Sequence, residues 1–113
     1  GPMAEAASVK DVFERHMPER LRSKPDLVTK INAVYQFNIN GQDGGQWEVD
    51  CATPGGAVTS GTSGAAKCTV TCTDSDFLSI VNGKLNPQMA FMMGKLKIQG
   101  DMGLALKLAQ LLG

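Results

Sequence analysis

The chain has 113 residues, of which 42% are hydrophobic and 19% charged, and its 11 basic and 11 acidic residues give a formal net charge of zero. This length and composition predict one globular domain. Nucleic-acid-binding domains carry a basic surface, so the neutral charge and the pI of about 6.8 argue against that class.

The N-terminal residues and the cysteines predict where the protein works. Gly1-Pro2 before Met3 is typical of the scar that a protease leaves when an expression tag is removed, so we assign residues 3–113 to the domain. No signal peptide pattern follows Met3, and no run of about 18 apolar residues is present. The odd number of cysteines, three, favours a reducing intracellular compartment, and we expect the cytoplasm.

The first predicted element is a helix. Ser8 and Asp11 resemble a capping box, and Pro18 predicts that the helix kinks or restarts there. Pro25 suits the start of a second short helical piece over residues 26–30. The apolar residues of the first helix recur at helical spacing: Val9, Val12, Phe13 and Met17.

Alternating apolar and polar residues then predict strands. Residues 33–40 and 46–51, separated by a glycine-rich turn, form a predicted hairpin, and a short strand over 57–60 and a clearer one over 66–73 follow. Cys68 and Cys72 share one face of the last of these, about 13 Å apart by the strand rise. That separation is too long for one metal ion or a disulfide, so we interpret both as buried apolar residues.

The last third of the chain predicts more helices and one strand. Thr73–Asp76 caps a helix that Gly83 ends, and Asn86-Pro87 begins another that Gly94 ends. A strand over 95–99 and a final helix over 102–112 complete the chain. The element order predicts an α+β fold: a mostly antiparallel sheet with helices packed on one face.

The final predicted helix is apolar on nearly every side, whereas a surface helix has a polar back. Met89, Met92, Met93 and Met102 add further apolar surface nearby. One interpretation is that all of this is core. The other is that a domain of this size cannot absorb it, so it meets a bound apolar ligand, a membrane or another chain.

Catalytic and cofactor motifs are not found. We interpret the one histidine, His16, as a half-exposed helix residue, and Asp74 and Asp76 as helix-capping residues rather than a catalytic carboxylate pair. The Gly-Lys pairs at residues 83–84 and 94–95 lack the upstream glycine and following Ser/Thr of a phosphate loop. We predict no catalytic residue, cofactor or metal site.

Several segments together resemble the sterol carrier protein 2 family. They are residues 28–37, 47–50, 74–77, 83–87, 90–91, 94–98, 100–102 and 106–108, and the resemblance extends from about Val12 to Leu112. It implies a five-stranded mixed sheet with helices over one face and an apolar tunnel for fatty acids, acyl-CoA, sterols or phospholipids. Some members are peroxisomal, but the ending Leu111-Leu112-Gly113 is not a peroxisomal tripeptide.

The resulting hypothesis is an intracellular lipid carrier, not an enzyme. Hiding about fifteen methylenes of a fatty acid from water gains on the order of 12 kcal/mol before ordering costs, at roughly 0.8 kcal/mol each. We expect the apolar cavity to be built from Phe13, Met17, Leu21, Ile31, Phe37, Trp47, Phe77, Ile80, Val81, Met89, Phe91, Met92, Ile98, Met102, Leu104, Leu106 and Leu108, with the final helix as its gate. Arg20, Arg22, Lys24 and Lys30 are the candidate head-group ligands, and the resemblance places a ligand head near them.

Two alternatives stay open at this point. The chain is a protein-interaction or dimerisation module that docks through the final helix, or it is a hydrolase or isomerase that acts on a lipid. The second requires a nucleophile and a base that the sequence does not reveal. Contact with a membrane surface is expected only transiently, and the oligomeric state is not predicted.

Overall fold

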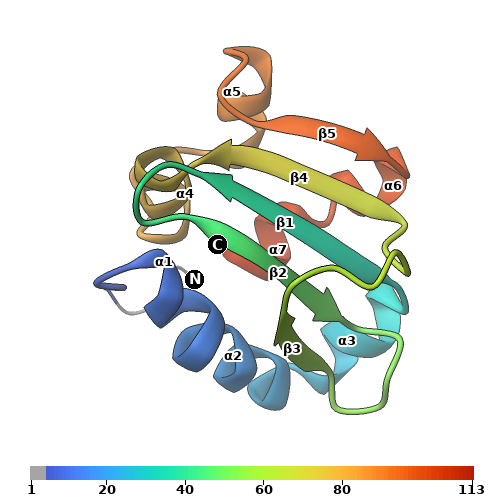
Figure 1. Ribbon diagram of the computed structural model, residues 1–113. Coiled ribbons are helices and arrows are strands. Elements are labelled where there is room, and N and C mark those ends of the chain that lie inside the picture. The colour runs from blue at the N-terminus through green and yellow to red at the C-terminus, as the bar shows by residue number, and fades with distance from the viewer. Residues whose placement is uncertain (1–4) are drawn as a thin grey trace.

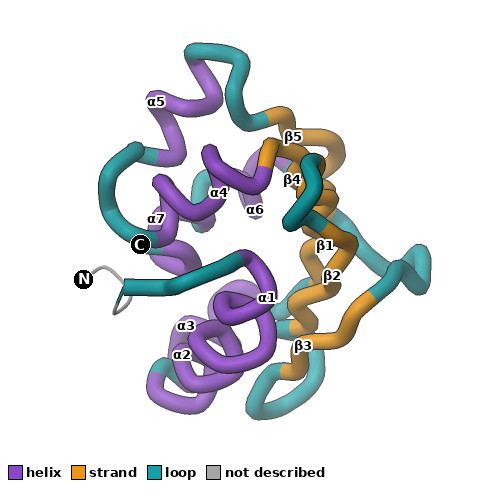
Figure 2. The backbone as a smooth tube through the Cα atoms, turned by 60° about the vertical axis from the view of Figure 1, so that its left-hand side comes forward, coloured by secondary structure: helices purple, strands orange, loops and turns teal. Residues whose placement is uncertain are grey.

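Residues 5–113 are described in the computed structural model, and they form a five-stranded sheet with helices over one face (Figures 1 and 2). The expectations for Gly1-Pro2 and Met3 lie outside these residues. The strands are β1 (Val34–Asn40), β2 (Gly45–Asp50), β3 (Ala57–Ser60), β4 (Cys68–Thr73) and β5 (Lys97–Gly100).

The strands lie in the order β3-β2-β1-β4-β5. β1 pairs in parallel with β4, and the other neighbours are antiparallel. The predicted fold class is therefore confirmed.

The N-terminal helix runs through three consecutive segments: α1 (Val9–Asp11), a π-helical segment η1 (Val12–His16) and α2 (Met17–Ser23). The Met17 N–H donates to the Val12 carbonyl five residues earlier, and α2 begins with Pro18 in its first turn. Proline lacks an N–H, so the wider turn comes just before it. The predicted kink or restart at Pro18 takes the form of a change from π-helix to α-helix, because the backbone at His16 and Met17 stays helical. α3 (Pro25–Ile31) follows.

His16 is buried, so its interpretation as a half-exposed residue is wrong. Its Nε2 atom lies 3.1 Å from Asp11 Oδ2 and 2.9 Å from Arg15 Nη2. The wide π-helical turn places residues five apart above one another, and an ordinary helical pattern does not predict that contact.

The remaining helices are α4 (Asp74–Val81), α5 (Pro87–Met92), α6 (Met102–Ala105) and α7 (Leu108–Leu112). The prediction of one final helix over 102–112 is wrong, because the chain bends between α6 and α7. There the Lys107 N–H donates to the Leu104 carbonyl, and the Gln110 N–H donates to the Lys107 carbonyl. These tight bonds change the helix direction. The bend lets Leu104 and the leucines of α7 all bury their side chains.

The core lies between the sheet and the helices. Phe37 is the register partner of both Trp47 and Val70, and Val70 is the partner of Ile98. Phe13 stacks on Trp47 and on Phe77 at 5.2 Å between ring centroids. Aromatic side chains therefore cover the centre of the sheet around Phe37, whereas Ile98, on the edge strand β5, is only partly buried.

Candidate functional site

An apolar pocket of about 310 Å³ lies where α5, α6 and α7 meet the β5 edge of the sheet. Figure 1 shows α5 standing beyond β5, with α7 behind the sheet. The lining residues are Asn86, Pro87, Gln88, Phe91, Met92, Leu96, Ile98, Met102, Ala105, Leu106, Leu108 and Ala109. None of them carries a formal charge, so the pocket suits a hydrocarbon ligand.

Local hydrogen bonds hold α5 in this position. Asn86 caps the helix by accepting from the N–H groups of Gln88 and Met89. The chain then turns, and the N–H groups of Lys95 and Leu96 donate back to the Ala90 carbonyl. Ala90 and Leu96 are buried. The remaining apolar side chains of α5 therefore point into the pocket or to solvent.

Two side chains from the body of the protein anchor the C-terminal segment. The buried Tyr35 hydroxyl donates to the Leu104 carbonyl at 2.6 Å. Burial raises the pKa of Tyr35 well above its usual value, so the hydroxyl keeps its proton and remains a donor. Arg20, which is also buried, donates from Nη1 to the Gln110 carbonyl at 3.4 Å. Between these two anchors, Leu106 is exposed.

The structure divides the seventeen predicted cavity residues into three groups. Six line the apolar pocket: Phe91, Met92, Ile98, Met102, Leu106 and Leu108. Ten lie in the core or pack against it: Phe13, Met17, Leu21, Ile31, Phe37, Trp47, Phe77, Ile80, Val81 and Leu104. Met89 is exposed beside the pocket. Ligand contact by the last two groups stays a prediction.

Sequence reasoning missed half of the lining. Leu96 lies in a predicted strand, which gives no sign of a ligand contact, and Ala105 and Ala109 are too small to stand out in an apolar pattern. For Asn86, Pro87 and Gln88, the sequence predicts only the start of a helix. Their role follows from the placement of α5 beyond the sheet edge, which local sequence does not specify.

All six exposed large hydrophobic residues of the described chain fall between residues 89 and 106. We call this group the methionine rim: Met89, Phe91, Met92, Met93, Met102 and Leu106. Four of its members, Phe91, Met92, Met102 and Leu106, also line the apolar pocket. The rim therefore borders the pocket on its exposed side.

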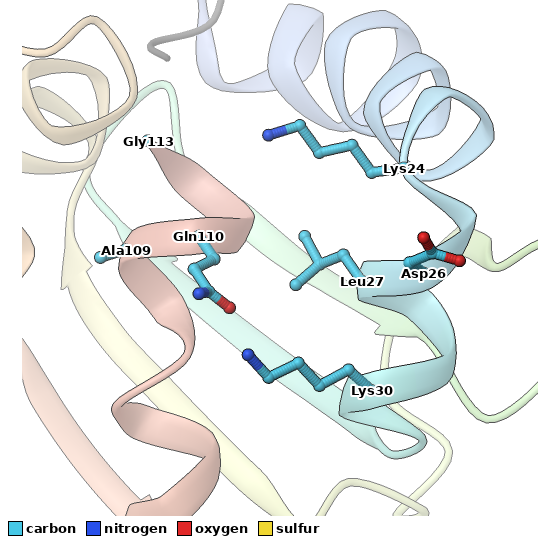
Figure 3. Close-up of a pocket in the computed structure, with 7 residues that line it drawn as sticks. All are labelled: Lys24, Asp26, Leu27, Lys30, Ala109, Gln110 and Gly113. Atoms are coloured by element: carbon cyan, nitrogen blue, oxygen red, sulfur yellow. The ribbon is translucent and has the colours of Figure 1, made fainter.

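A second cavity, of about 420 Å³, lies between α3 and α7 (Figure 3). Lys24 and Lys30 extend into it from the α3 side, on either side of Leu27, and Asp26 lies at its margin. Ala109 and Gln110 come from α7, and Gly113 completes the lining. Ala109 also lines the apolar pocket, so α7 is the wall between the two.

The four candidate head-group residues lie in three different places. Lys24 and Lys30 line the second cavity, and in the described chain neither has a carboxylate partner within 4.0 Å. Arg22 is exposed on α2. Arg20 is buried against α7, and burial lowers its pKa from the usual value.

The three cysteines have the surroundings of structural residues. Cys51, Cys68 and Cys72 are buried and free, which confirms the predicted burial of Cys68 and Cys72. Burial raises the pKa of Cys72 to about 12 and that of Cys51 and Cys68 to about 11, so none carries a thiolate near neutral pH. Within residues 5–113, no cluster of three metal-ligating side chains is found. No helix in this range has the length and apolar character to cross a bilayer.

Comparison with known proteins places these features in a family. The model of the SCP-2 sterol transfer family matches residues 13–113. The chain belongs to this family. It is 41% identical over 112 residues to hydroxysteroid dehydrogenase-like protein 2 of Bos taurus, covering 98% of this chain but 26% of that protein. The chain thus spans about a quarter of that relative's length.

Solved structures from the family share the fold. The solution structure of sterol carrier protein domain 2 of Helicoverpa armigera has a TM-score of 0.71 and 34% identity, covering 96% of this chain and 91% of that one. The NMR structure of palmitated SCP2L2 from Aedes aegypti has a TM-score of 0.66 and 29% identity, with 93% and 94% covered.

Proposed function

We propose that this sterol carrier protein 2 domain is a non-enzymatic carrier that binds one lipid through its hydrocarbon chain in the apolar pocket beside β5. The observation that carries the proposal is the pocket itself, because an uncharged cavity opens through a rim of exposed methionine, phenylalanine and leucine side chains. Family membership supports it, as does the palmitated state of the Aedes aegypti relative. Fatty acids, acyl-CoA, sterols and phospholipids all fit this chemistry.

The pocket dimensions suit this task. At about 310 Å³, it is at the lower end of the roughly 300–1,000 Å³ of small-molecule sites. Each methylene that leaves water gains roughly 0.8 kcal/mol, and the gain does not depend on the head group. We therefore expect loose selectivity among lipids of similar chain length. Methionine side chains are flexible, which lets the lining adapt to different chains.

We assign the head group to the second cavity. Lys24 and Lys30 supply two cations there, and α7 alone separates them from the apolar pocket. A chain that passes under or around α7 places its carboxylate or phosphate beside these lysines, where charge-assisted hydrogen bonds hold it. Arg20 then acts indirectly, because its bond to the Gln110 carbonyl positions α7.

The protein's setting is part of the proposal. We place the domain over residues 3–113, within a cell, where it takes lipid from one membrane and delivers it to another. It requires no cofactor, because the work of the site is the removal of hydrocarbon from water.

A pocket-filling variant tests the function. Ala105 lines the pocket, so Ala105→Phe places a ring where the chain would lie. If the ring displaces three or four methylenes, the affinity falls by about 2–3 kcal/mol, roughly 30- to 150-fold. The matched control is Ala57→Phe, at an exposed position of β3 on the opposite sheet edge.

The measurement is titration of each protein with a fluorescent fatty acid, with circular dichroism as a check on folding. We expect Ala57→Phe to bind like the parent chain and Ala105→Phe to bind far more weakly. Equal affinity of a folded Ala105→Phe variant would show that the lipid chain does not occupy this pocket. No binding by the parent chain to any fatty acid, sterol or phospholipid would reject the carrier function itself.

A further inference from the structure

Charge around the pocket opening is uneven in a way that the net charge of zero conceals. Residues 77–113 contain four lysines and one aspartate, Asp101, so this part carries a charge of +3 while the rest of the chain carries −3. Between residues 77 and 100, three lysines and no acidic residue occur: Lys84, Lys95 and Lys97. All three are exposed, and they flank α5 and its exposed methionines on both sides in the chain.

The exposed apolar side chains and these lysines belong to one region of the fold. Figure 2 shows α5 at the end of the molecule that lies away from α1, α2 and α3. Met92 is 73% exposed and Met93 is 55% exposed, whereas the large apolar residues of the described chain outside the rim are buried or partly buried. Exposed clusters of this kind mark interaction sites rather than ordinary surface.

We propose that the methionine rim, flanked by Lys84, Lys95 and Lys97, docks on the surface of an anionic lipid bilayer. Apolar side chains that enter the acyl boundary, together with lysines that meet anionic head groups, are the combination by which peripheral helices bind membranes. This inference rests on the proposed carrier function. It adds the surface through which lipid passes, because rim residues also form the pocket lining.

The geometry gives docking a consequence for transfer. Phe91, Met92 and Leu106 belong both to the rim and to the pocket lining, so a docked protein presents the pocket opening to the bilayer. A lipid chain then moves from the bilayer into the pocket without crossing water. Met93 belongs to the rim, does not line the pocket and is not one of the predicted cavity residues. A substitution there separates docking from binding.

Two acidic residues near the rim weaken the attraction of its lysines to an anionic bilayer. Glu5 lies 3.9 Å from Lys84, with both side chains largely exposed, and Asp101 caps α6. The nearby negative charge of Glu5 offsets part of the attraction of Lys84 to an anionic surface. Lys95 and Lys97 have no carboxylate within 4.0 Å among residues 5–113. We therefore expect Lys95 and Lys97 to dominate the salt dependence of docking.

The test compares binding to vesicles of phosphatidylcholine alone and to vesicles that also contain phosphatidylserine. We expect the chain to co-sediment with the anionic vesicles, and less so at about 1 M salt, where screening shortens the reach of charges to about 3 Å. Lys95→Gln with Lys97→Gln lowers partitioning about 25-fold, from roughly fivefold for each lysine at an anionic surface. The charge-matched control is Lys10→Gln with Arg22→Gln, at exposed positions of α1 and α2, and it should keep partitioning within about twofold of the parent chain.

The apolar half of the proposal is tested with Met93→Gln. We expect this variant to bind a fluorescent fatty acid in solution as the parent does, but to lose vesicle binding by about tenfold or more and to transfer the fatty acid between vesicles more slowly. Parent-level docking by this folded variant, or no docking by the parent chain on anionic vesicles, overturns the inference. Both outcomes leave the carrier function intact if fatty acid still binds in solution.

A second copy of the chain is the remaining competitor for the rim. Sedimentation equilibrium without lipid separates the cases. A dimer that Met93→Gln dissociates assigns the rim to self-association and rejects docking on a bilayer. A parent chain that is monomeric and still docks supports it.

Discussion

Removing the Tyr35 hydroxyl tests how the C-terminal segment is held. Tyr35→Phe deletes only the oxygen that donates to the Leu104 carbonyl at 2.6 Å, and the ring stays in the core. A buried acceptor left without any partner costs about 1–3 kcal/mol. The Leu104 carbonyl, however, also accepts from the Lys107 N–H at 3.1 Å, so it keeps one bond. We therefore expect a loss of about 1 kcal/mol, near the net value of one hydrogen bond.

Urea unfolding and amide hydrogen exchange measure this effect. A loss of about 1 kcal/mol corresponds to a fall in Tm of about 4 °C for a domain of this size. Because the bond connects β1 to α6, exchange in α7 should accelerate more than exchange in β1 and β4. Thr69→Val, a hydroxyl deletion on β4, is the control and should change stability by less than about 0.5 kcal/mol. An unchanged urea midpoint for Tyr35→Phe, with unchanged exchange in α7, would refute the anchoring role.

Two further predictions concern charge. Lys24→Gln with Lys30→Gln should remove the preference for a fatty acid over the corresponding fatty alcohol in competition titrations, whereas Arg22→Gln should retain it; a preserved preference in the double variant would reject the second cavity as the head-group site. The hydrogen bond from Arg15 lowers the pKa of Asp11 from 3.8 to about 2. The stabilisation from Asp11 is therefore present above about pH 4 and disappears as the pH falls toward 2. The difference in urea midpoint between the parent and Asp11→Asn should shrink over that range, and a constant difference from pH 6 to pH 2 would contradict it.

Much of the fold was predictable because its signals are local. The alternation on β1 and β2 specifies which side chains face the helices, and the hairpin turn brings those two strands together. Capping residues such as Thr73, Asn86 and Asp101 mark helix starts correctly, because each accepts from backbone N–H groups that lack helical partners.

Features that depend on distant contacts were not predictable. The parallel pairing of β1 with β4 requires the chain to cross after β3, and neither strand carries a pattern that names its neighbour. The bend at Leu106 contains no proline or glycine, so nothing in the apolar run predicts it. It forms because Tyr35 fixes the Leu104 carbonyl while Leu108 and the leucines after it turn into the core.

The candidate site was predicted in part for a related reason. Core and pocket lining use the same apolar side chains, so composition alone does not separate Phe13, which stacks between aromatic rings, from Phe91, which lines the pocket. The methionines between residues 89 and 102 were the better signal. Their flexible side chains are common where apolar surface must accept varied partners.

The central claim is that a lipid chain lies among α5, α6, α7 and β5. Photo-crosslinking tests it most directly, with a fatty acid that carries a diazirine near its methyl end and peptide mapping by mass spectrometry. The account predicts adducts on Phe91, Met92, Met102 and Leu106, which unlabelled fatty acid competes away. Competed adducts confined to other surfaces, or no specific adduct in a folded protein, would contradict it.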